Sequence, residues 1–227
     1  MKIAPSIMCA DLLRISDVLE DLEAGGADSL HVDVMDGRLV PGFTFGADFV
    51  GQLGRATGLP LDLHLMSADP ERHLPQFLDC GAATLAVHPE ACADPYRMLE
   101  TIRRAGVGAG LALNPGTPLA ALTPYLDVLD VVIIMAVCPG FVGQPQIEAC
   151  RKKAADLVLD LVRQGRTDIE VVLDGGVKEL NLRSIAACGV HKVVSGSGVF
   201  GADRGVREQL QAMQSVAKKQ RESPINA

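Results

Sequence analysis

Short apolar runs alternate along the chain with longer stretches that have helical spacing. The short runs are rich in valine, isoleucine and leucine and therefore predict strands. They lie at Lys2–Ile7, Ser29–Met35, Leu61–Met66, Thr84–His88, Gly108–Leu113, Val131–Val137, Ile169–Asp174 and Lys192–Ser195. Helices are predicted between them, for example at Asp11–Ala24, Asp94–Arg104, Ile147–Gln164 and Leu180–Cys188. Strands that alternate with helices over short connections indicate a parallel sheet.

A glycine followed by a small apolar residue recurs where predicted helices end. It is found at Gly26-Ala27, Gly81-Ala82, Gly106-Val107 and Gly189-Val190, and glycine there is the usual left-handed helix stop. The spacings approach multiples of about 27 residues, and eight such units need about 216 residues, close to the 227 present. We therefore predict a single-domain α/β fold, a (β/α)8 TIM barrel over residues 1–220, with a frayed C-terminal tail at 221–227. An open doubly wound sheet is the competing architecture, although the first strand–helix turn lacks GxGxxG.

Composition narrows the class of protein. Hydrophobic residues make up 48% and charged residues 22% of the chain, as in a globular protein with a large core. The net charge of −7 argues against binding to nucleic acid or to an anionic membrane. The N-terminal residues resemble neither a signal peptide nor a membrane span. The six cysteines show no CxxC pair and suggest reduced thiols, so we expect a cytoplasmic protein.

The second predicted strand is polar on one face, although a parallel strand is normally apolar on both. The side chains of His31 and Asp33 point the same way because strand side chains alternate with a period of two. A protected interior is a costly place for both unless they bind a metal, bind each other or do chemistry. Asp36 lies on the other face at the following turn, where we expect it to cap or fix the loop.

The third predicted strand repeats this pattern with Asp62 and His64, and the seventh ends at Asp174. Active sites of barrels of this kind are built at the carboxyl ends of the strands. Side chains from these strands could therefore converge on one divalent cation, with ligands His31, Asp33, His64 and Asp174. Such a set suits Zn²⁺, Fe²⁺, Mn²⁺ or Co²⁺ better than Mg²⁺ or Ca²⁺. The alternative is that each is an ordinary buried polar residue satisfied by its neighbours.

The other histidines and the lysines restrict the chemistry further. His88 ends the fourth predicted strand before a proline, where it either positions the chain or supports a metal ligand; His73 and His191 are predicted at the surface. None of the seven lysines stands at the carboxyl end of a predicted strand, where a Schiff-base nucleophile would have to be. A lysine-dependent aldolase is therefore disfavoured. No GxSxG or paired Cys/His arrangement suggests a covalent hydrolase.

Glycine-rich turns follow the last three predicted strands, at Pro139–Gln144, Asp174–Gly176 and Ser195–Gly198. Glycine lets backbone N–H groups approach an anion closely, and a following helix adds favourable partial charge. The loops after strands seven and eight are the usual phosphate site of this architecture. Despite the acidic net charge, the cluster predicts phosphate binding.

Several motifs resemble the ribulose-phosphate 3-epimerase family. They are IAPSIMCADLL, HVDVMDGRLVPGFTFG, LDLHLM, VHPE, LALNPGTPL, PGFVGQ, DGGV and GSGVFG, in order across nearly the whole chain. The resemblance implies a (β/α)8 barrel of the ribulose-phosphate-binding type. It implies an isomerase that epimerises ketose phosphates at C3 with one divalent metal ion per subunit, in a small homo-oligomer. It implies that Asp33 and Asp174 are the catalytic acid/base pair as well as metal ligands with His31 and His64. The implied substrate-binding residues are Ser6, His64, Gly140, Phe141, Val142, Gly143, Gly175, Gly176, Gly196 and Ser197, and Met35, Met66 and Met135 are implied to line the reaction chamber.

Elementary chemistry agrees with this assignment. A proton beside a ketone is too weakly acidic to remove unless the resulting enediolate is stabilised, and a divalent cation on the C2 and C3 oxygens would do so. Inversion needs one group that takes the proton from one face and another that returns it to the other. Two aspartates in proximity to a metal would titrate as a coupled pair. For the methionines, plain core packing is the alternative to a chamber wall.

Several positions depart from the family pattern and bear on the substrate. Arg38 and Gly42 replace a usual histidine and asparagine, Cys138 replaces a polar residue, Val142 replaces a glycine, and Val172 stands where a glutamate is common. MCADLL and GQP lean toward the D-allulose-6-phosphate branch, but we favour conversion of D-ribulose 5-phosphate to D-xylulose 5-phosphate. A catalytically silent phosphosugar-binding barrel and another phosphate-binding isomerase or lyase are the alternatives.

Overall fold

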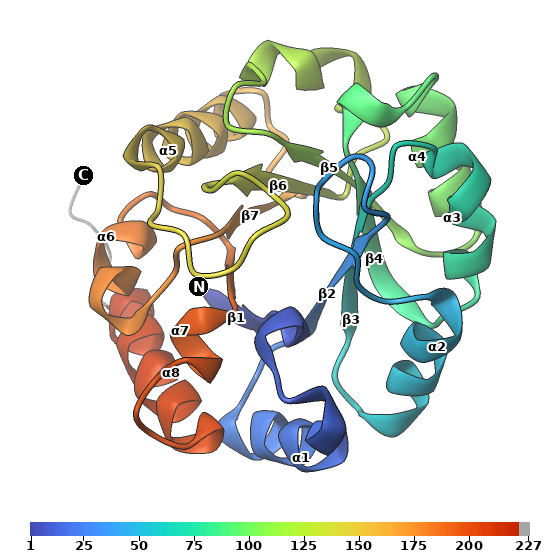
Figure 1. Ribbon diagram of the computed structural model, residues 1–227. Coiled ribbons are helices and arrows are strands. Elements are labelled where there is room, and N and C mark those ends of the chain that lie inside the picture. The colour runs from blue at the N-terminus through green and yellow to red at the C-terminus, as the bar shows by residue number, and fades with distance from the viewer. Residues whose placement is uncertain (223–227) are drawn as a thin grey trace.

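Eight parallel strands form a barrel within residues 1–222, whose backbone the computed structural model describes; side chains are described for residues 1–218. The hydrogen-bonded strand order is β1-β8-β7-β6-β5-β4-β3-β2, and a parallel bridge between Ser6 and His31 links β1 to β2. Figure 1 shows the strands at the centre with helices around them. The strands are β1 (Lys2–Pro5), β2 (Leu30–Met35), β3 (Leu61–Met66), β4 (Ala82–Val87), β5 (Gly108–Leu113), β6 (Val131–Met135), β7 (Glu170–Asp174) and β8 (Lys192–Ser195).

The outer helices confirm the predicted alternation. The α-helices are α1 (Ile15–Gly25), α2 (Ala47–Ala56), α3 (Pro70–Leu78), α4 (Pro95–Arg104), α5 (Glu148–Arg163), α6 (Leu182–Ala186), α7 (Ser197–Phe200) and α8 (Val206–Glu222). The 3₁₀ helices are η1 (Ile7–Cys9), η2 (Leu12–Arg14), η3 (Pro89–Ala91), η4 (Leu119–Tyr125) and η5 (Glu179–Asn181). The predicted (β/α)8 barrel is therefore confirmed, and the open sheet is not observed in the described residues.

Local side-chain chemistry sets several helix boundaries. Asp69 and Asp94 each accept a hydrogen bond from a backbone N–H in the first turn of α3 and α4, and each is followed by proline at the first helical position. Gly26 ends α1 with a φ of 83°, the left-handed conformation that glycine adopts without a Cβ clash. The helix predicted at Asp11–Ala24 instead starts with η2, where the Asp11 carboxylate accepts a hydrogen bond from the N–H of Leu13 at 3.1 Å.

The helix predicted at Leu180–Cys188 is also divided. It consists of η5 followed by α6. Asn181 stands at the junction, where its side-chain oxygen accepts a hydrogen bond from the N–H of Lys178 at 2.8 Å and its amide donates to the carbonyl oxygen of Gly176. These bonds tie the start of the helix back to the loop that follows β7.

The core has two parts because each strand is covered on both faces. Alternate residues such as Leu30, Val32 and Leu63 face the surrounding helices and belong to the large cluster between barrel and helices. The barrel interior holds a second cluster of alanine and β-branched residues and one methionine, which fill it as packed layers. These residues are Ala4, Ala86, Ala112, Val131, Ile133, Met135, Val137, Val172 and Val194.

A buried ion cluster occupies the amino-terminal end of the barrel. Lys192 and Glu170 are the first residues of β8 and β7, and the Lys192 ammonium lies 2.8 Å from a carboxylate oxygen of Glu170 and of Asp62. The Asp62 carboxylate also accepts hydrogen bonds from the hydroxyls of Ser29 at 2.5 Å and Thr84 at 2.9 Å. Asp62 is therefore a structural residue at the end of the barrel opposite the strand carboxyl ends, although its strand has the polar pattern of β2.

Two further observations concern the whole chain. Within the described residues, no helix is both long and apolar enough to cross a membrane. Helix α8 runs to Glu222, and residues 223–227 of the predicted tail at 221–227 lie outside the described residues. The tail therefore stays a prediction.

Candidate active site

The carboxyl ends of β2, β3 and β7 bring four predicted ligands together. One ligand atom each from His31, Asp33, His64 and Asp174 lies within 4.8 Å of all the others, and all four residues are buried. Asp33 Oδ1 lies 3.3 Å from both His31 Nε2 and His64 Nδ1. Asp174 Oδ2 lies 3.7 Å from the same two nitrogens. The cluster is thus held by three strands whose register the barrel fixes.

The spacing of these atoms fits a metal ion better than a hydrogen-bonded network. His31 Nε2 and His64 Nδ1 are buried and make no hydrogen bond in the described residues, which is costly for a polar atom. Ligand atoms about 2.1 Å from a tetrahedral ion stand about 3.4 Å apart, close to the observed 3.3 and 3.7 Å. The four residues therefore fit a divalent cation of the transition series, since imidazole and carboxylate suit such ions.

Electrostatics separates the two carboxyl groups of the cluster. Burial works to raise the pKa of Asp33, but His31 and His64 outweigh it and hold that pKa well below its usual value. Burial raises the pKa of Asp174 to about 7, and the neighbouring Asp33 charge adds to this. When the environments of two carboxyl groups push their pKa values apart, one group can act as a base and the other as an acid.

The two histidines respond to the cluster in opposite directions, and only the pKa of His31 shows the pull of the carboxylates. Burial works to lower the pKa of His31, but the carboxylates of Asp33 and Asp174 raise it to about 9. The pKa of His64 is lowered, chiefly by burial, which favours the neutral form that ligates metals. A divalent cation would supply the positive charge that the two carboxylates favour.

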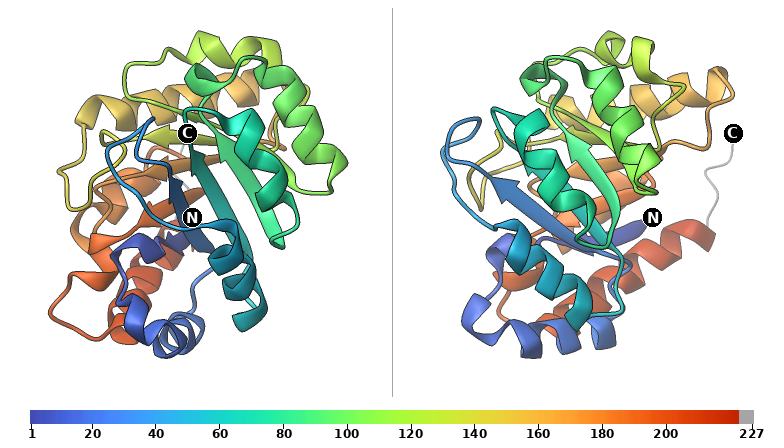
Figure 2. Two further views of the ribbon diagram at one scale, coloured as in Figure 1. Left: turned by 45° about the vertical axis from the view of Figure 1, so that its right-hand side comes forward. Right: turned by 90° about the vertical axis from the view of Figure 1, so that its right-hand side faces the viewer.

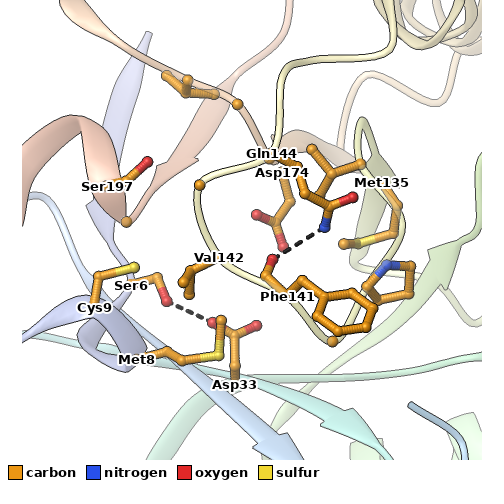
Figure 3. Close-up of a pocket in the computed structure, with 18 of the residues that line it drawn as sticks. Ser6, Met8, Cys9, Asp33, Met135, Phe141, Val142, Gln144, Asp174 and Ser197 are labelled. Atoms are coloured by element: carbon orange, nitrogen blue, oxygen red, sulfur yellow. Dashed lines mark hydrogen bonds between the residues drawn. The ribbon is translucent and has the colours of Figure 1, made fainter. Parts of the chain in front are cut away.

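A glycine-lined cavity opens above this cluster, with an empty volume of about 540 Å³ that includes its open mouth. Figure 3 shows Asp33 and Asp174 reaching into it, with Ser6 on one side and the loop of Phe141, Val142 and Gln144 along it. Every predicted substrate-binding residue except His64 lines the cavity, and so do the three predicted chamber methionines. His64 is fully buried and lies in the ligand cluster. The binding roles of these residues stay predictions.

The orientation of Asp33 is set by its neighbours. Its Oδ2 accepts a hydrogen bond of 2.5 Å from the Ser6 hydroxyl, which leaves Oδ1 facing the two histidines. Its carbonyl oxygen accepts a hydrogen bond of 2.5 Å from the Thr44 hydroxyl, which in turn accepts one of 2.9 Å from the N–H of Met35. The two oxygens of the Asp33 carboxylate are therefore held toward different partners.

The turn after β7 requires glycine at two successive positions. Gly175 and Gly176 have φ values of 108° and 64°. A Cβ at Gly175 would lie 2.5 Å from a methyl carbon of Val137, and one at Gly176 would lie 2.7 Å from the backbone nitrogen of Gln146. The backbone of this turn lies so close to the loop after β6 that no side chain fits there. The turn borders the cavity beside Asp174.

The loops after β2 and β6 meet over the cavity. Both views in Figure 2 place them at the same end of the barrel, and a Cβ at Gly140 would lie 2.9 Å from Cδ of Pro41. As predicted, Asp36 fixes the first loop: its carboxylate accepts hydrogen bonds from the N–H groups of Arg38, Leu39 and Ala68 at 2.7 to 2.9 Å. This ties the loop after β2 to the end of β3.

Sequence reasoning missed Met8 and Cys9, which line the cavity from η1. Met8 packs with Met35 and Met66 in a cluster at the cavity wall. Burial, together with Asp33 and Asp174, raises the pKa of the Cys9 thiol to about 11, so the thiol stays neutral. Both residues directly follow β1, and their position at the carboxyl end of a strand was the sequence feature that could have indicated a place in the cavity.

The remaining histidines take different places. His88 is buried, and its Nε2 lies 2.9 Å from Nε2 of His64, so it contacts a predicted ligand directly. His191 is exposed, as predicted. His73, which was also predicted at the surface, is half-buried, and its Nδ1 lies 2.7 Å from the Ser67 hydroxyl.

The departures from the family pattern are scattered. Arg38 and Cys138 are exposed, and Val142 borders the cavity with 56% of its surface exposed. Val172 instead packs in the barrel interior. Of these, Val142 is thus placed to affect ligand binding directly.

A (β/α)8 barrel with a buried His/Asp centre and a glycine-lined cavity at the carboxyl ends of its strands defines an enzyme class in which loops at that end build the active site. Comparison with known proteins narrows the class. The model of a family described as "Ribulose-phosphate 3 epimerase family" matches residues 2–200. The chain therefore belongs to the ribulose-phosphate 3-epimerase family, and it is an epimerase, an enzyme of the isomerase class.

Individual relatives agree with this assignment. The ribulose-phosphate 3-epimerase of Bacillus subtilis is 40% identical over 201 residues, which cover 88% of this chain and 93% of the relative. The chloroplastic ribulose-5-phosphate-3-epimerase of Arabidopsis thaliana is 41% identical over 202 residues, with 88% and 72% covered. The crystal structure of phosphoribosyl anthranilate isomerase from Thermus thermophilus matches with a TM-score of 0.66 at 20% identity, covering 96% of this chain and 99% of that one. At 20% sequence identity, this structural similarity shows a shared fold and nothing about activity.

Proposed function

We propose that this epimerase interconverts D-ribulose 5-phosphate and D-xylulose 5-phosphate in a metal-dependent reaction. The observation that carries the proposal is the cluster at the cavity floor, where two carboxylates and two histidine nitrogens lie within 4.8 Å of one another. Its two aspartates come from β2 and β7 and both line the cavity. Epimerisation needs such a pair, because one group must take a proton from one face of C3 and another must return it to the opposite face.

Asp33 and Asp174 are the proposed acid/base pair. The protein environment lowers the pKa of Asp33 and raises that of Asp174, so the two carboxyl groups differ in how readily they accept and donate a proton. With ribulose phosphate bound between them, one carboxylate accepts the C3 proton while the other carboxyl donates a proton to the opposite face. The roles exchange in the reverse reaction, as microscopic reversibility requires. Ser6 holds Asp33 in place through the 2.5 Å hydrogen bond.

His31, His64, Asp33 and Asp174 are the residues proposed to hold one divalent ion, Zn²⁺, Fe²⁺, Mn²⁺ or Co²⁺. When bound, the ion would act as a Lewis acid toward the ketone and the neighbouring hydroxyl of the substrate, which lowers the barrier to proton removal at C3. The methionine thioethers at 35, 66 and 135 supply a cavity wall that excludes water and has no acidic proton to compete.

The substrate phosphate is proposed to bind the turns after the last three strands. Gly143, Gly176, Gly196 and Ser197 line one cavity, where backbone N–H groups can approach an anion. This local binding accounts for phosphate recognition by a protein of net charge −7. Val142, where the family has glycine, adds a side chain to this part of the cavity but keeps the backbone N–H that could bind phosphate.

The substrate assignment is tested by kcat/KM on metal-saturated enzyme. We expect a higher kcat/KM for D-ribulose 5-phosphate than for D-allulose 6-phosphate. The reverse order would place the enzyme in the allulose-phosphate branch. Turnover of neither, with binding of both, would identify a silent phosphosugar-binding barrel and refute the proposal.

Location and assembly are also proposed. We infer a cytoplasmic protein from the reduced-type cysteine usage. We infer a small homo-oligomer from the family resemblance, and light scattering of the purified protein tests it, because a monomer at micromolar concentration would contradict it.

A further inference from the structure

His64 contacts a second histidine on the side that faces away from the ligand cluster. Its Nε2 lies 2.9 Å from Nε2 of His88, and the two ring planes are tilted by 31°. Both side chains are almost completely buried. The other ring nitrogen of His64, Nδ1, is the atom that faces Asp33 and Asp174. The His64 ring therefore connects the candidate metal centre to His88.

The far nitrogen of His88 in turn faces Glu90. His88 Nδ1 is buried, makes no hydrogen bond in the described residues, and lies 3.7 Å from Glu90 Oε2. The other carboxylate oxygen of Glu90 accepts hydrogen bonds from the Thr117 hydroxyl and, at 3.2 Å, from the side-chain amide of Asn114. The Glu90 side chain is 34% exposed. A continuous row of polar groups thus runs from the buried centre to the rim of the barrel.

The hydrogen positions in this row have one solution that agrees with metal binding. A neutral imidazole carries one N–H and one lone pair. If the His64 Nδ1 lone pair points at a cation, its Nε2 carries the hydrogen and donates to Nε2 of His88. His88 then carries its own hydrogen on Nδ1, which is the atom directed at the Glu90 carboxylate. An ionised carboxylate can only accept, so it selects this tautomer.

We propose that His88 and Glu90 are positioning residues for the metal centre, with Glu90 fixing the tautomer of His88 and thereby directing the Nδ1 lone pair of His64 into the ligand cluster. The inference rests on the proposed metal site. Neither residue touches the substrate or the reacting atoms in this scheme. Partners that orient a metal-binding histidine in this way contribute about 10- to 100-fold to metal affinity.

The direct test is the dissociation constant of Co²⁺, measured by competition with a coloured chelator at one fixed pH. Glu90→Gln keeps the size of the side chain but can present an amide N–H to His88, so we expect the dissociation constant to rise about 10- to 100-fold. The matched control is Glu100→Gln, which removes an exposed carboxylate that pairs with Arg104 on the outer helix α4. The control should bind Co²⁺ like the wild type.

A double-mutant cycle distinguishes orientation from long-range charge. In His88→Gln the amide oxygen can accept from His64 whatever Glu90 does, so adding Glu90→Gln should cause no further loss of Co²⁺ affinity. The proposal is overturned if Glu90→Gln alone binds Co²⁺ like the wild type, or if its effect is the same in the His88→Gln background. Glu90 is partly exposed, so its single variant tests the proposal even if His88→Gln does not fold. Failure of the wild type itself to bind Co²⁺ would refute the metal centre and this inference together.

Discussion

Lys192 lies at the amino-terminal end of the barrel, and its replacement by methionine tests the buried ion cluster. The variant keeps an unbranched side chain but leaves the buried Asp62 carboxylate without its partner at 2.8 Å. Removing one member of a buried ion pair costs about 3–5 kcal/mol. Ser29 and Thr84 still donate hydrogen bonds to Asp62, so we expect the lower end, about 3 kcal/mol. For a domain of this size that lowers Tm by about 6–12 °C.

Thermal and urea unfolding at pH 7 measure this loss. The matched control is Lys152→Met, because the Lys152 ammonium pairs with Asp156 at 2.6 Å on the exposed face of α5. An exposed pair contributes at most about 1 kcal/mol. A loss in Lys192→Met no greater than in the control would refute the argument.

The pH dependence gives a second check with a definite sign. Burial works to raise the pKa of Asp62, but Lys192, helped by the Ser29 hydrogen bond and the His31 charge, outweighs it and lowers that pKa in the wild type. A carboxyl group whose pKa is lowered by folding stabilises the folded state at pH values above its pKa in the unfolded chain, which is about 4. This stabilisation is lost as the pH falls below that value. Removing Lys192 takes away the strongest opposition to burial, so we expect the pKa of Asp62 to rise. The stability difference between Lys192→Met and the wild type should therefore narrow as the pH falls from 7 toward 4, and a constant difference would contradict this.

The same variant tests the exclusion of lysine chemistry. Lys192 lies at the end of the barrel opposite Asp174, and residues at that end contribute to stability rather than to catalysis. Folded Lys192→Met should retain the wild-type kcat/KM at a temperature well below its Tm. Loss of activity in the folded variant would mean that the lysine takes part in the reaction.

Two further predictions concern the site. Exhaustive chelation should abolish epimerisation, and Mn²⁺ or Co²⁺ should restore it; full activity in the chelated enzyme, with metal content measured, would contradict the metal requirement. Gly176→Ala should raise KM for the phosphorylated ketose, because its Cβ would lie 2.7 Å from the backbone nitrogen of Gln146 in a left-handed turn; an unchanged KM would argue that this turn does not bind phosphate. Gly205→Ala, with open space around its Cβ, is the control.

The sequence predicted the fold well because its signals are local. Strand alternation placed His31 and Asp33 on the interior face, and the glycine stop at Gly26 has the expected left-handed conformation. The carboxyl-end rule for parallel barrels then placed Asp174 at the same rim. Each of these inferences needs only a few neighbouring residues or a general property of the architecture.

Long-range pairing could not be predicted in the same way. Asp62 and His64 have the spacing of His31 and Asp33, yet Asp62 pairs with Lys192, which is 130 residues away in the sequence. Strand register and barrel closure decide that pairing, and neither can be read from the periodicity of the sequence. The role of His88 stayed open for the same reason, because only the 2.9 Å contact between ring nitrogens distinguishes a support for His64 from a core residue.

The central claim is that Asp33 and Asp174 exchange protons with opposite faces of C3. Proton NMR in D₂O tests it on metal-saturated Asp174→Asn, offered D-ribulose 5-phosphate and D-xylulose 5-phosphate separately. The wild type should introduce deuterium at C3 of both and interconvert them. The variant should lose about 10²- to 10⁴-fold in epimerisation and should exchange C3 of at most one of the two sugars, because one carboxylate remains. Exchange and interconversion of both sugars at the wild-type rate would contradict the two-aspartate mechanism.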